Sequence, residues 1–213
     1  MIVCGRRQDR IDELRARFPE IVGRVCDVTD EGQRLALAEW AGERHPAANV
    51  LVNNAGIQQP LDLTRPLDMA KVRAEVATNL VAPLHLASLF APLLARNGGA
   101  AIVNVTSGLA FAPLAFMPLY CATKAALHSL SLSMRRQLRD LGVRVYEIAP
   151  PSVDSELGRD RWAPGQTSHG GMPVAEFVQE MLKALEADLP EAAIGQSARM
   201  REQREAMFDI LNK

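Results

Sequence analysis

Ala101-Ile-Val-Asn-Val-Thr-Ser107 and Tyr120-Cys-Ala-Thr-Lys124 are the two stretches that decide the fold of this chain. The run from Ile102 to Val105 is short, apolar and β-branched, as expected of a buried parallel strand. Ser107 follows that strand at its carboxyl end, which is the ligand-facing edge of an open α/β sheet. Tyr120 and Lys124 are four residues apart on the helix expected next, so their side chains share one face. A hydroxyl, a phenol and an ammonium are thus predicted to converge on one point.

The rest of the chain alternates between short apolar runs and amphipathic stretches. This alternation, without repeats or a linker, predicts a single domain over residues 1–213. The predicted fold class is α/β, a doubly wound, Rossmann-like parallel sheet in three α/β/α layers. We expect strands at residues 2–4, 21–26, 49–52, 102–105 and 143–148, and helices at residues 8–18, 29–44, 67–95, 120–141, 174–187 and 197–211.

One part of such a fold has no counterpart in the sequence. A dinucleotide-binding sheet opens with a strand, a glycine-rich turn and a helix whose N-terminus binds the pyrophosphate. No G-x-G-x-x-G pattern precedes the strand at residues 2–4. The spacing from Gly165 to Gly170 lacks the Lys and Ser/Thr of a P-loop and follows no predicted strand. We therefore expect an N-terminally truncated domain that lacks the first βα unit, in which residues 2–4 either pair differently or border a gap or exposed edge in the sheet.

Composition excludes several classes of protein. The chain has 213 residues, 48% of them hydrophobic, and a net charge of −1, so it offers no electrostatic surface for nucleic acid or an anionic membrane. No run of consecutive apolar residues approaches the 18 of a membrane span, and the N-terminus has no signal-peptide pattern. The three cysteines, Cys4, Cys26 and Cys121, are not spaced as metal ligands and are expected to be buried thiols. These features predict a cytoplasmic protein without a metal.

Further motifs stand where the other predicted strands end. Asp27 and Val28 follow the second strand, Asn53-Asn54-Ala55-Gly56 follows the third, and Asn79 lies within the long helix at residues 67–95. Taken from the residues alone, Asp27 could cap a helix, residues 53–56 could form a turn, and Asn79 could bind a neighbouring backbone group. Combined with Ser107 thirteen residues before Tyr120, and with residues 150–155, the pattern resembles the short-chain dehydrogenase/reductase family of the classical type. The runs Gly108–Phe111 and Ala149–Val153 resemble the branch named after the D-alanylation operon oxidoreductase.

The resemblance implies an oxidoreductase with four catalytic residues, Asn79, Ser107, Tyr120 and Lys124. A free tyrosine has a pKa of about 10, and an ammonium one helical turn away is expected to lower it. Tyr120 would then exchange a proton with a carbonyl or alcohol oxygen, to which Ser107 donates a hydrogen bond. In the family, the residue at Lys124 also binds the nicotinamide ribose, and the one at Asn79 supports a proton relay.

The resemblance also implies residues that bind the cofactor. Asp27 and Val28 are expected beside the adenine, Asn53 is expected to lock the sheet, and Ala55 and Gly56 are expected to pass close to the cofactor. The other expected cofactor-binding residues are Tyr120, Lys124, Pro150, Val153 and Ser155, the last three of which follow the strand at 143–148. NAD-preferring sites place a carboxylate near the end of the second Rossmann strand. Here that place reads Gly5-Arg6-Arg7, and an arginine fork suits a 2′-phosphate. NADP is therefore the expected cofactor, with NAD possible, and Arg6 is expected to contact it ahead of Arg7; the competing interpretation is that both cap the helix from solvent.

The remaining expectations concern substrate, partners and an alternative function. Residues 156–172 match the family's substrate lid, so His169 and Trp162 are expected substrate contacts, whereas His128 is expected to serve helix packing. The partner is a small-molecule carbonyl or alcohol, and the helices at about 67–95 and 118–141 are expected to form a homodimer or homotetramer. The alternative is a cofactor-deficient, non-catalytic protein that acts through association of those helices.

Overall fold

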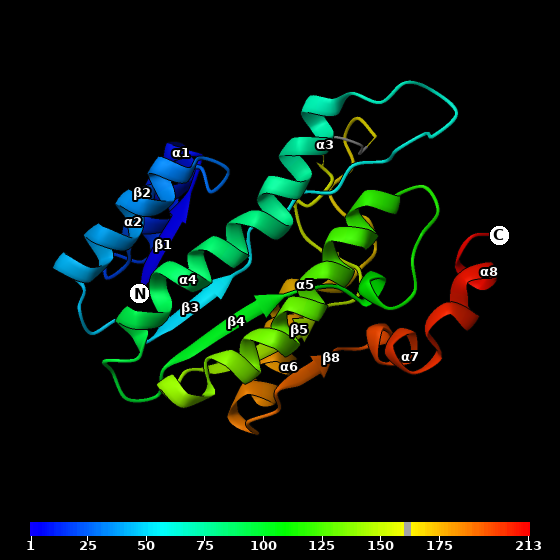
Figure 1. Cartoon of the computed structure of the whole chain (residues 1–213). Coiled ribbons are helices and arrows are strands. Elements are labelled where there is room, and N and C mark those ends of the chain that lie inside the picture. Colours follow the sequence, from blue (N-terminus) through cyan, green and yellow to red (C-terminus); the bar gives the residue numbers. More distant parts are fainter. Residues whose placement is uncertain (160–162) are drawn as a thin grey trace.

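The computed structural model describes residues 1–159 and 163–213, and parallel sheets form its centre (Figure 1). The main sheet has four strands in the order β3 (Val50–Asn53), β4 (Ala101–Val105), β5 (Arg144–Ala149) and β8 (Glu191–Ala193). A two-stranded sheet pairs β1 (Ile2–Gly5) with β2 (Val22–Val25), and another pairs β6 (Val153–Asp154) with β7 (Met172–Pro173). Each pairing is parallel, which confirms the predicted α/β class.

The helices follow the predicted order with two corrections. The predicted helix at residues 67–95 contains a π-helical turn, and the predicted helix at 197–211 breaks at Arg204, whose φ is 51°. Apolar periodicity does not reveal either interruption, because it continues through both. The helical elements are α1 (Gln8–Arg17), α2 (Glu31–Arg44), α3 (Met69–Val76), η1 (Ala77–Val81), α4 (Ala82–Leu94), η2 (Gly108–Ala110), α5 (Pro118–Gln137), η3 (Arg139–Leu141), α6 (Val174–Glu186), α7 (Gln196–Gln203), η5 (Arg204–Met207) and α8 (Phe208–Leu211).

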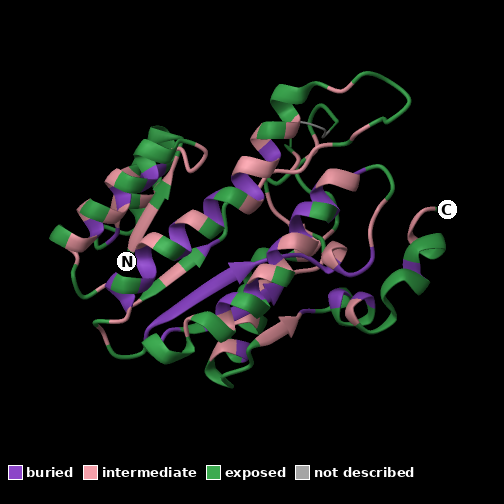
Figure 2. Ribbon diagram, viewed as in Figure 1, coloured by how far each residue is buried: buried purple, intermediate pink, exposed green. Residues whose placement is uncertain are grey.

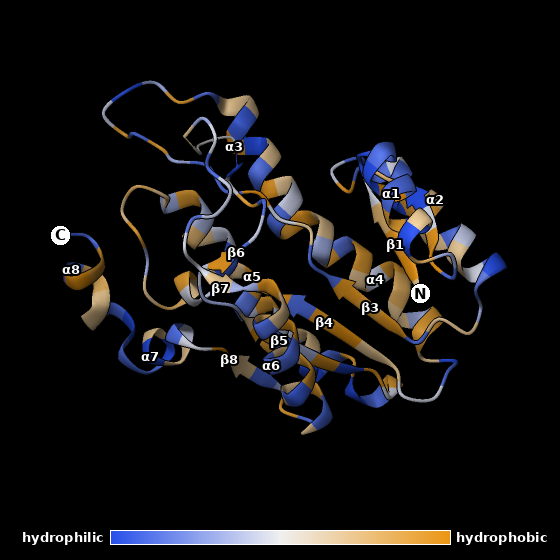
Figure 3. Ribbon diagram, turned by 180° about the vertical axis from the view of Figure 1, so that it is seen from behind, coloured by the Kyte–Doolittle hydropathy of each residue, from blue (hydrophilic) through white to orange (hydrophobic). Residues whose placement is uncertain are grey.

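Alternate residues of the main sheet pack against opposite helix layers, which produces the three layers predicted. Ile102 and Val145 belong to an apolar cluster with α2, α4 and α5, whereas Val103 and Ile148 pack with α6. All five residues of β4 are buried, so this strand lies at the centre of the core (Figure 2). Seen from behind, apolar residues likewise line the strands of the main sheet between their helices (Figure 3).

The continuous helical stretch Met69–Leu94 is long and apolar enough to cross a membrane by length and composition alone. Half of its most apolar window is buried inside the protein, where α4 packs on α2 and on the main sheet. A core helix of a sheet protein has this same composition, because one of its faces is covered by the sheet.

The sheet is interrupted between β1 and β3. In the described residues, β1 pairs only with β2, and β3 pairs only with β4. Val50 and Val52 of β3 are 48% and 53% exposed, although valines of an interior parallel strand are normally buried. Figure 1 shows the β1–β2 sheet beside β3, with α2 and α4 in contact across the interruption. A gap with an exposed edge was one of the two outcomes expected from the sequence.

Local details correct two smaller expectations. Cys26 and Cys121 are buried as expected, whereas Cys4 is exposed because β1 belongs to the two-stranded sheet rather than to the buried one. The helix expected at residues 29–44 begins later, because Asp30 caps α2 through a hydrogen bond that its side chain accepts from the backbone N–H of Gln33 at 2.9 Å.

Candidate active site at the carboxyl ends of the strands

Ser107, Tyr120 and Lys124 converge as predicted where β4 ends and α5 begins. The Ser107 hydroxyl oxygen accepts a hydrogen bond from Leu109 N–H at 3.1 Å, and Ser107 is close enough to the Tyr120 phenol to lower its pKa. Lys124 Nζ donates to the Val105 carbonyl at 2.8 Å and lies 5.7 Å from the centre of the Tyr120 ring. Because β4 is buried and rigid, it fixes both the hydroxyl and the ammonium relative to the phenol.

Burial dominates the acid–base properties of this group, contrary to the expectation from the sequence. Tyr120 and Lys124 are only 5% and 4% exposed. Burial raises the pKa of Tyr120 to about 12, with Ser107 acting in the opposite direction. Burial also lowers the pKa of Lys124 to about 8. Loss of solvent disfavours both charged forms, so the ammonium does not lower the phenol pKa here as predicted.

Asn79 lies in the π-helical turn η1, and it is completely buried. Its Oδ1 accepts a hydrogen bond from Ile57 N–H at 2.9 Å, while Nδ2 donates to the Ile57 carbonyl at 2.8 Å and to Thr123 Oγ1 at 3.1 Å. The side chain therefore joins the turn after β3 to the face of α5 beside Lys124. π-Helical turns are rare and concentrate at functional sites, which makes this position notable.

The turn after β3 passes beside the same group of residues. A Cβ placed on Gly56 would lie 3.6 Å from both Asn79 Oδ1 and Lys124 Nζ, whereas Ala55 is exposed. Asn53 is buried, and its Nδ2 donates to Asn104 Oδ1 at 2.9 Å. Asn104 Nδ2 in turn donates to Ser131 Oγ at 2.9 Å. This chain of side chains ties β3, β4 and α5 together, in agreement with a locking role for Asn53.

The expected adenine-side residues lie apart from this group, at the ends of β1 and β2. Arg6 and Arg7 are exposed, and Arg7 pairs with Glu156 at 3.0 Å. Burial would raise the pKa of Asp27, but hydrogen bonds from Thr29 and the charge of Arg6 lower it overall. The Val28 carbonyl accepts a hydrogen bond from Arg34 Nη1 at 2.6 Å. These residues follow the strands of the two-stranded sheet, so the pairing of Arg7 with Glu156 links the end of β1 to the segment after β6.

Of the residues expected after β5, Pro150 contacts the segment that follows Ser107. The Pro150 carbonyl accepts a hydrogen bond from Gly108 N–H at 3.0 Å. Val153 lies in β6, where its carbonyl accepts from Ser155 N–H at 2.8 Å and contacts His169 Nε2 at 2.9 Å. Trp162, the other expected substrate contact, lies outside the described residues.

Three contact residues were not predicted from the sequence: Asn104, Thr123 and Glu156. Asn104 carried a usable signal, because a polar residue inside an apolar strand needs a buried partner. Thr123 precedes Lys124, but only the π-helical turn brings Asn79 to it. Glu156 is 149 residues from its partner Arg7, and no local pattern indicates that contact.

Comparison with known proteins shows the family of this chain. The sequence profile of the short chain dehydrogenase family matches residues 1–164, and the chain therefore belongs to this family. It is 44% identical over 212 residues, 99% of this chain and 84% of the relative, to the uncharacterized oxidoreductase DltE of Bacillus subtilis (strain 168). The chain is accordingly an oxidoreductase of the short-chain dehydrogenase type.

Solved structures agree with this assignment. A short-chain dehydrogenase from Sphingobium yanoikuyae in complex with NADPH has a TM-score of 0.78 and 26% identity, over 90% of this chain and 76% of the other. A short chain dehydrogenase from Burkholderia cenocepacia J2315 in complex with NADP has a TM-score of 0.78 and 28% identity, over 93% of this chain and 79% of the other.

Proposed function

We propose that this chain is an NADP-dependent oxidoreductase that interconverts a carbonyl and an alcohol on a small, fairly apolar substrate. The observation that carries the proposal is the buried group of Ser107, Tyr120 and Lys124, in which Lys124 Nζ lies 5.7 Å from the Tyr120 ring centre and donates to the Val105 carbonyl just before Ser107. In the direction of reduction, Tyr120 transfers its phenolic proton to the substrate oxygen, and Ser107 donates a hydrogen bond to that oxygen as negative charge develops. The hydride that completes the alcohol is supplied by the cofactor.

The residues present fit a phosphorylated dinucleotide at two places. Gly56 leaves space beside Lys124 Nζ and Asn79, where the resemblance puts the nicotinamide ribose. Arg6 and Arg7 offer exposed guanidinium groups at the end of β1, where a 2′-phosphate would bind. The structural neighbours named above hold NADPH and NADP.

The non-catalytic alternative is less favoured. The family profile and the neighbours belong to dehydrogenases, and the buried Ser107, Tyr120 and Lys124 retain a geometry that association through helices does not require.

The proposal is tested by following the absorbance of reduced nicotinamide with a panel of small ketones and aldehydes, at high concentrations of NADPH or NADH. We expect consumption of NADPH in preference to NADH, with the preference reduced in Arg6→Glu and retained in Arg136→Glu, an exposed arginine on α5. Strong preference for NADH would contradict the NADP assignment. Absence of turnover with either cofactor, despite measurable binding, would contradict the catalytic assignment.

A further inference from the structure

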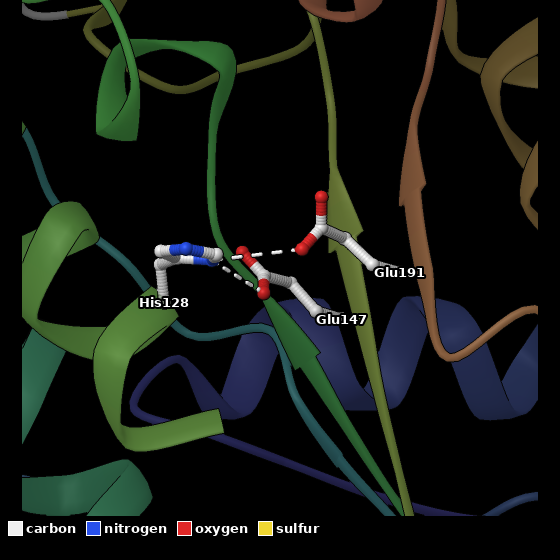
Figure 4. Close-up of side chains that lie close together, drawn as sticks. All are labelled: His128, Glu147 and Glu191. Atoms are coloured by element: carbon white, nitrogen blue, oxygen red, sulfur yellow. Dashed lines mark hydrogen bonds and ion pairs between the residues drawn. The ribbon is translucent and has the colours of Figure 1, made fainter. Parts of the chain in front are cut away.

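A buried polar network lies behind the catalytic strand end, and Glu147 of β5 is at its centre (Figure 4). The Glu147 side chain is fully buried. His128 Nδ1 lies 2.8 Å from Glu147 Oε2, and Thr106 Oγ1 donates a hydrogen bond to Glu147 Oε1 at 2.8 Å. Both carboxylate oxygens are therefore satisfied, each by a different element of the fold.

Each partner of Glu147 is directly linked to a residue of the proposed active site. Thr106 immediately precedes Ser107, and it is buried together with it. His128 follows Lys124 by four residues on α5, and Lys124 follows Tyr120 by four, so the three side chains lie along one helix face. One carboxylate therefore joins the strand end that carries Ser107 to the helix that carries Tyr120.

Further contacts surround the His128 imidazole and Glu147. Glu191 pairs in register with Glu147, and its Oε1 accepts a hydrogen bond from Arg201 Nε at 2.6 Å. Glu191 Oε2 lies 3.9 Å from His128 Nδ1, and the Phe111 ring packs edge-on against the imidazole, with ring centres 5.0 Å apart. His128, Glu147 and Glu191 are close enough together to surround a cation. However, the Glu147 carboxylate already binds Thr106 and His128, and Glu191 Oε1 accepts a hydrogen bond from Arg201. Hydrogen bonds within the protein therefore explain the cluster.

We propose that Glu147 and His128 are positioning residues that set the placement of Ser107 relative to Tyr120. A displaced Glu147 carboxylate would lose its hydrogen bonds with Thr106 and His128 inside the protein, where unpaired polar groups are costly, and this cost holds the strand end and the helix in one arrangement. Proton transfer is sensitive to displacements of this kind, and a shift of about 1 Å can cost about a hundredfold in rate. The importance of Glu147 and His128 for catalysis rests on the proposed function. The connection that they make between the strand end and α5 rests only on the observed contacts.

The position of Tyr120 can be measured without an activity assay. The chain has two tyrosines, so a Tyr146→Phe background labelled with 3-fluorotyrosine has a single fluorine resonance, from Tyr120. In this background we expect Glu147→Gln and His128→Phe to shift the resonance. We also expect them to raise the phenol pKa, because Ser107 then no longer stabilises the phenolate. His128→Asn retains an N–H donor near Nδ1, and it should restore the resonance toward that of the parent.

The control separates positioning from general loss of stability. Ile11→Val removes a methyl group from a buried site on α1, and should lower the melting temperature without moving the fluorine resonance. An unchanged resonance and titration in both Glu147→Gln and His128→Phe, with circular dichroism showing folded protein, would overturn the proposal. A resonance that moves when a chelator is added to the unsubstituted cluster would also overturn it, since a metal ion would then hold the side chains.

Kinetics provide the second measurement. In an active enzyme, Glu147→Gln should lower kcat by about 10- to 100-fold while KM changes far less, because the substrate pocket is not altered. If Glu147→Gln and an Ile11→Val enzyme of the same melting temperature lost kcat equally, the positioning role would be overturned. If the parent chain itself shows no turnover, the proposed function fails, and the fluorine measurement still decides whether Glu147 positions Tyr120.

Discussion

At the scale of single residues, the site is a set of ionisable groups held out of water. Tyr120 and Lys124 are both buried. Burial raises the pKa of Tyr120 and lowers that of Lys124, and both changes favour the neutral side chain. The sequence predicted that these residues meet, because a spacing of four determines a helix face. It could not predict their protonation, since the degree of burial depends on how β3, β4 and α5 pack together.

Lys124 makes stability depend on pH in a predictable direction. Its pKa is about 8 in the folded protein, below the 10.5 expected when it is exposed, so between pH 8 and 10.5 the unfolded chain binds more protons. The free energy of unfolding should therefore rise with pH across this window, and the destabilisation is fully present below it. Urea denaturation should show the parent chain gaining about 2 kcal/mol relative to Lys124→Met between pH 7.5 and pH 10. Parallel pH dependence in the two proteins would contradict the account.

At the scale of elements, short strands and strand-end motifs were predictable, but the interruptions were not. The β-branched run at 102–105 forms a strand as expected, and β3 ends at Asn53 where the Asn-Asn-Ala-Gly motif begins, because strand composition and strand-ending residues act locally. The π-helical turn at Asn79 was missed, since its sequence has the same apolar periodicity as the flanking α-helices. Contacts between distant elements, such as that of Gly108 with α7, have no local signal.

Gly108 provides a test of how α7 supports the Ser107 turn. A Cβ at this position would meet Ser197 Oγ and would lie 2.7 Å from Met200 Sδ, so these two side chains of α7 must shift to admit a methyl group. Gly108→Ala should lower the free energy of unfolding by about 1–3 kcal/mol, as overpacking does. Gly98→Ala, with open space around its Cβ, is the matched control and should change stability far less. Equal chemical denaturation midpoints for these two variants would refute the close approach.

At the scale of the whole molecule, the main feature is a parallel sheet interrupted between β1 and β3. A gap or exposed edge was one of the two outcomes expected from the sequence, whereas the contact of α2 with α4, which holds the β1–β2 sheet beside the rest, was not expected. Exposed Leu84 on α4 and Leu132 on α5 are compatible with the predicted homodimer or homotetramer. That association, like the cytoplasmic location, stays a prediction.

The interruption should be visible in hydrogen exchange. Because β3 has one free edge and the β1–β2 sheet is small, their amides should exchange through local opening, whereas those of β4 and β5 require unfolding of the main core. Exchange followed by mass spectrometry in increasing urea should show β1 and β2 losing protection first and β4 and β5 last. Uniform protection across all of these strands would mean that the two sheets unfold as one unit.

The central claim is that Tyr120 donates the proton, and replacing this one hydroxyl tests it most directly. Tyr120→Phe keeps the ring and removes the proton, while Tyr146→Phe, on β5, is the matched control. Turnover with NADPH and a reactive ketone, measured alongside NADPH binding by fluorescence, should fall by about 10²- to 10⁴-fold in Tyr120→Phe with binding nearly unchanged. Tyr146→Phe should retain most of its activity. Turnover by Tyr120→Phe at the rate of the parent chain would contradict the account.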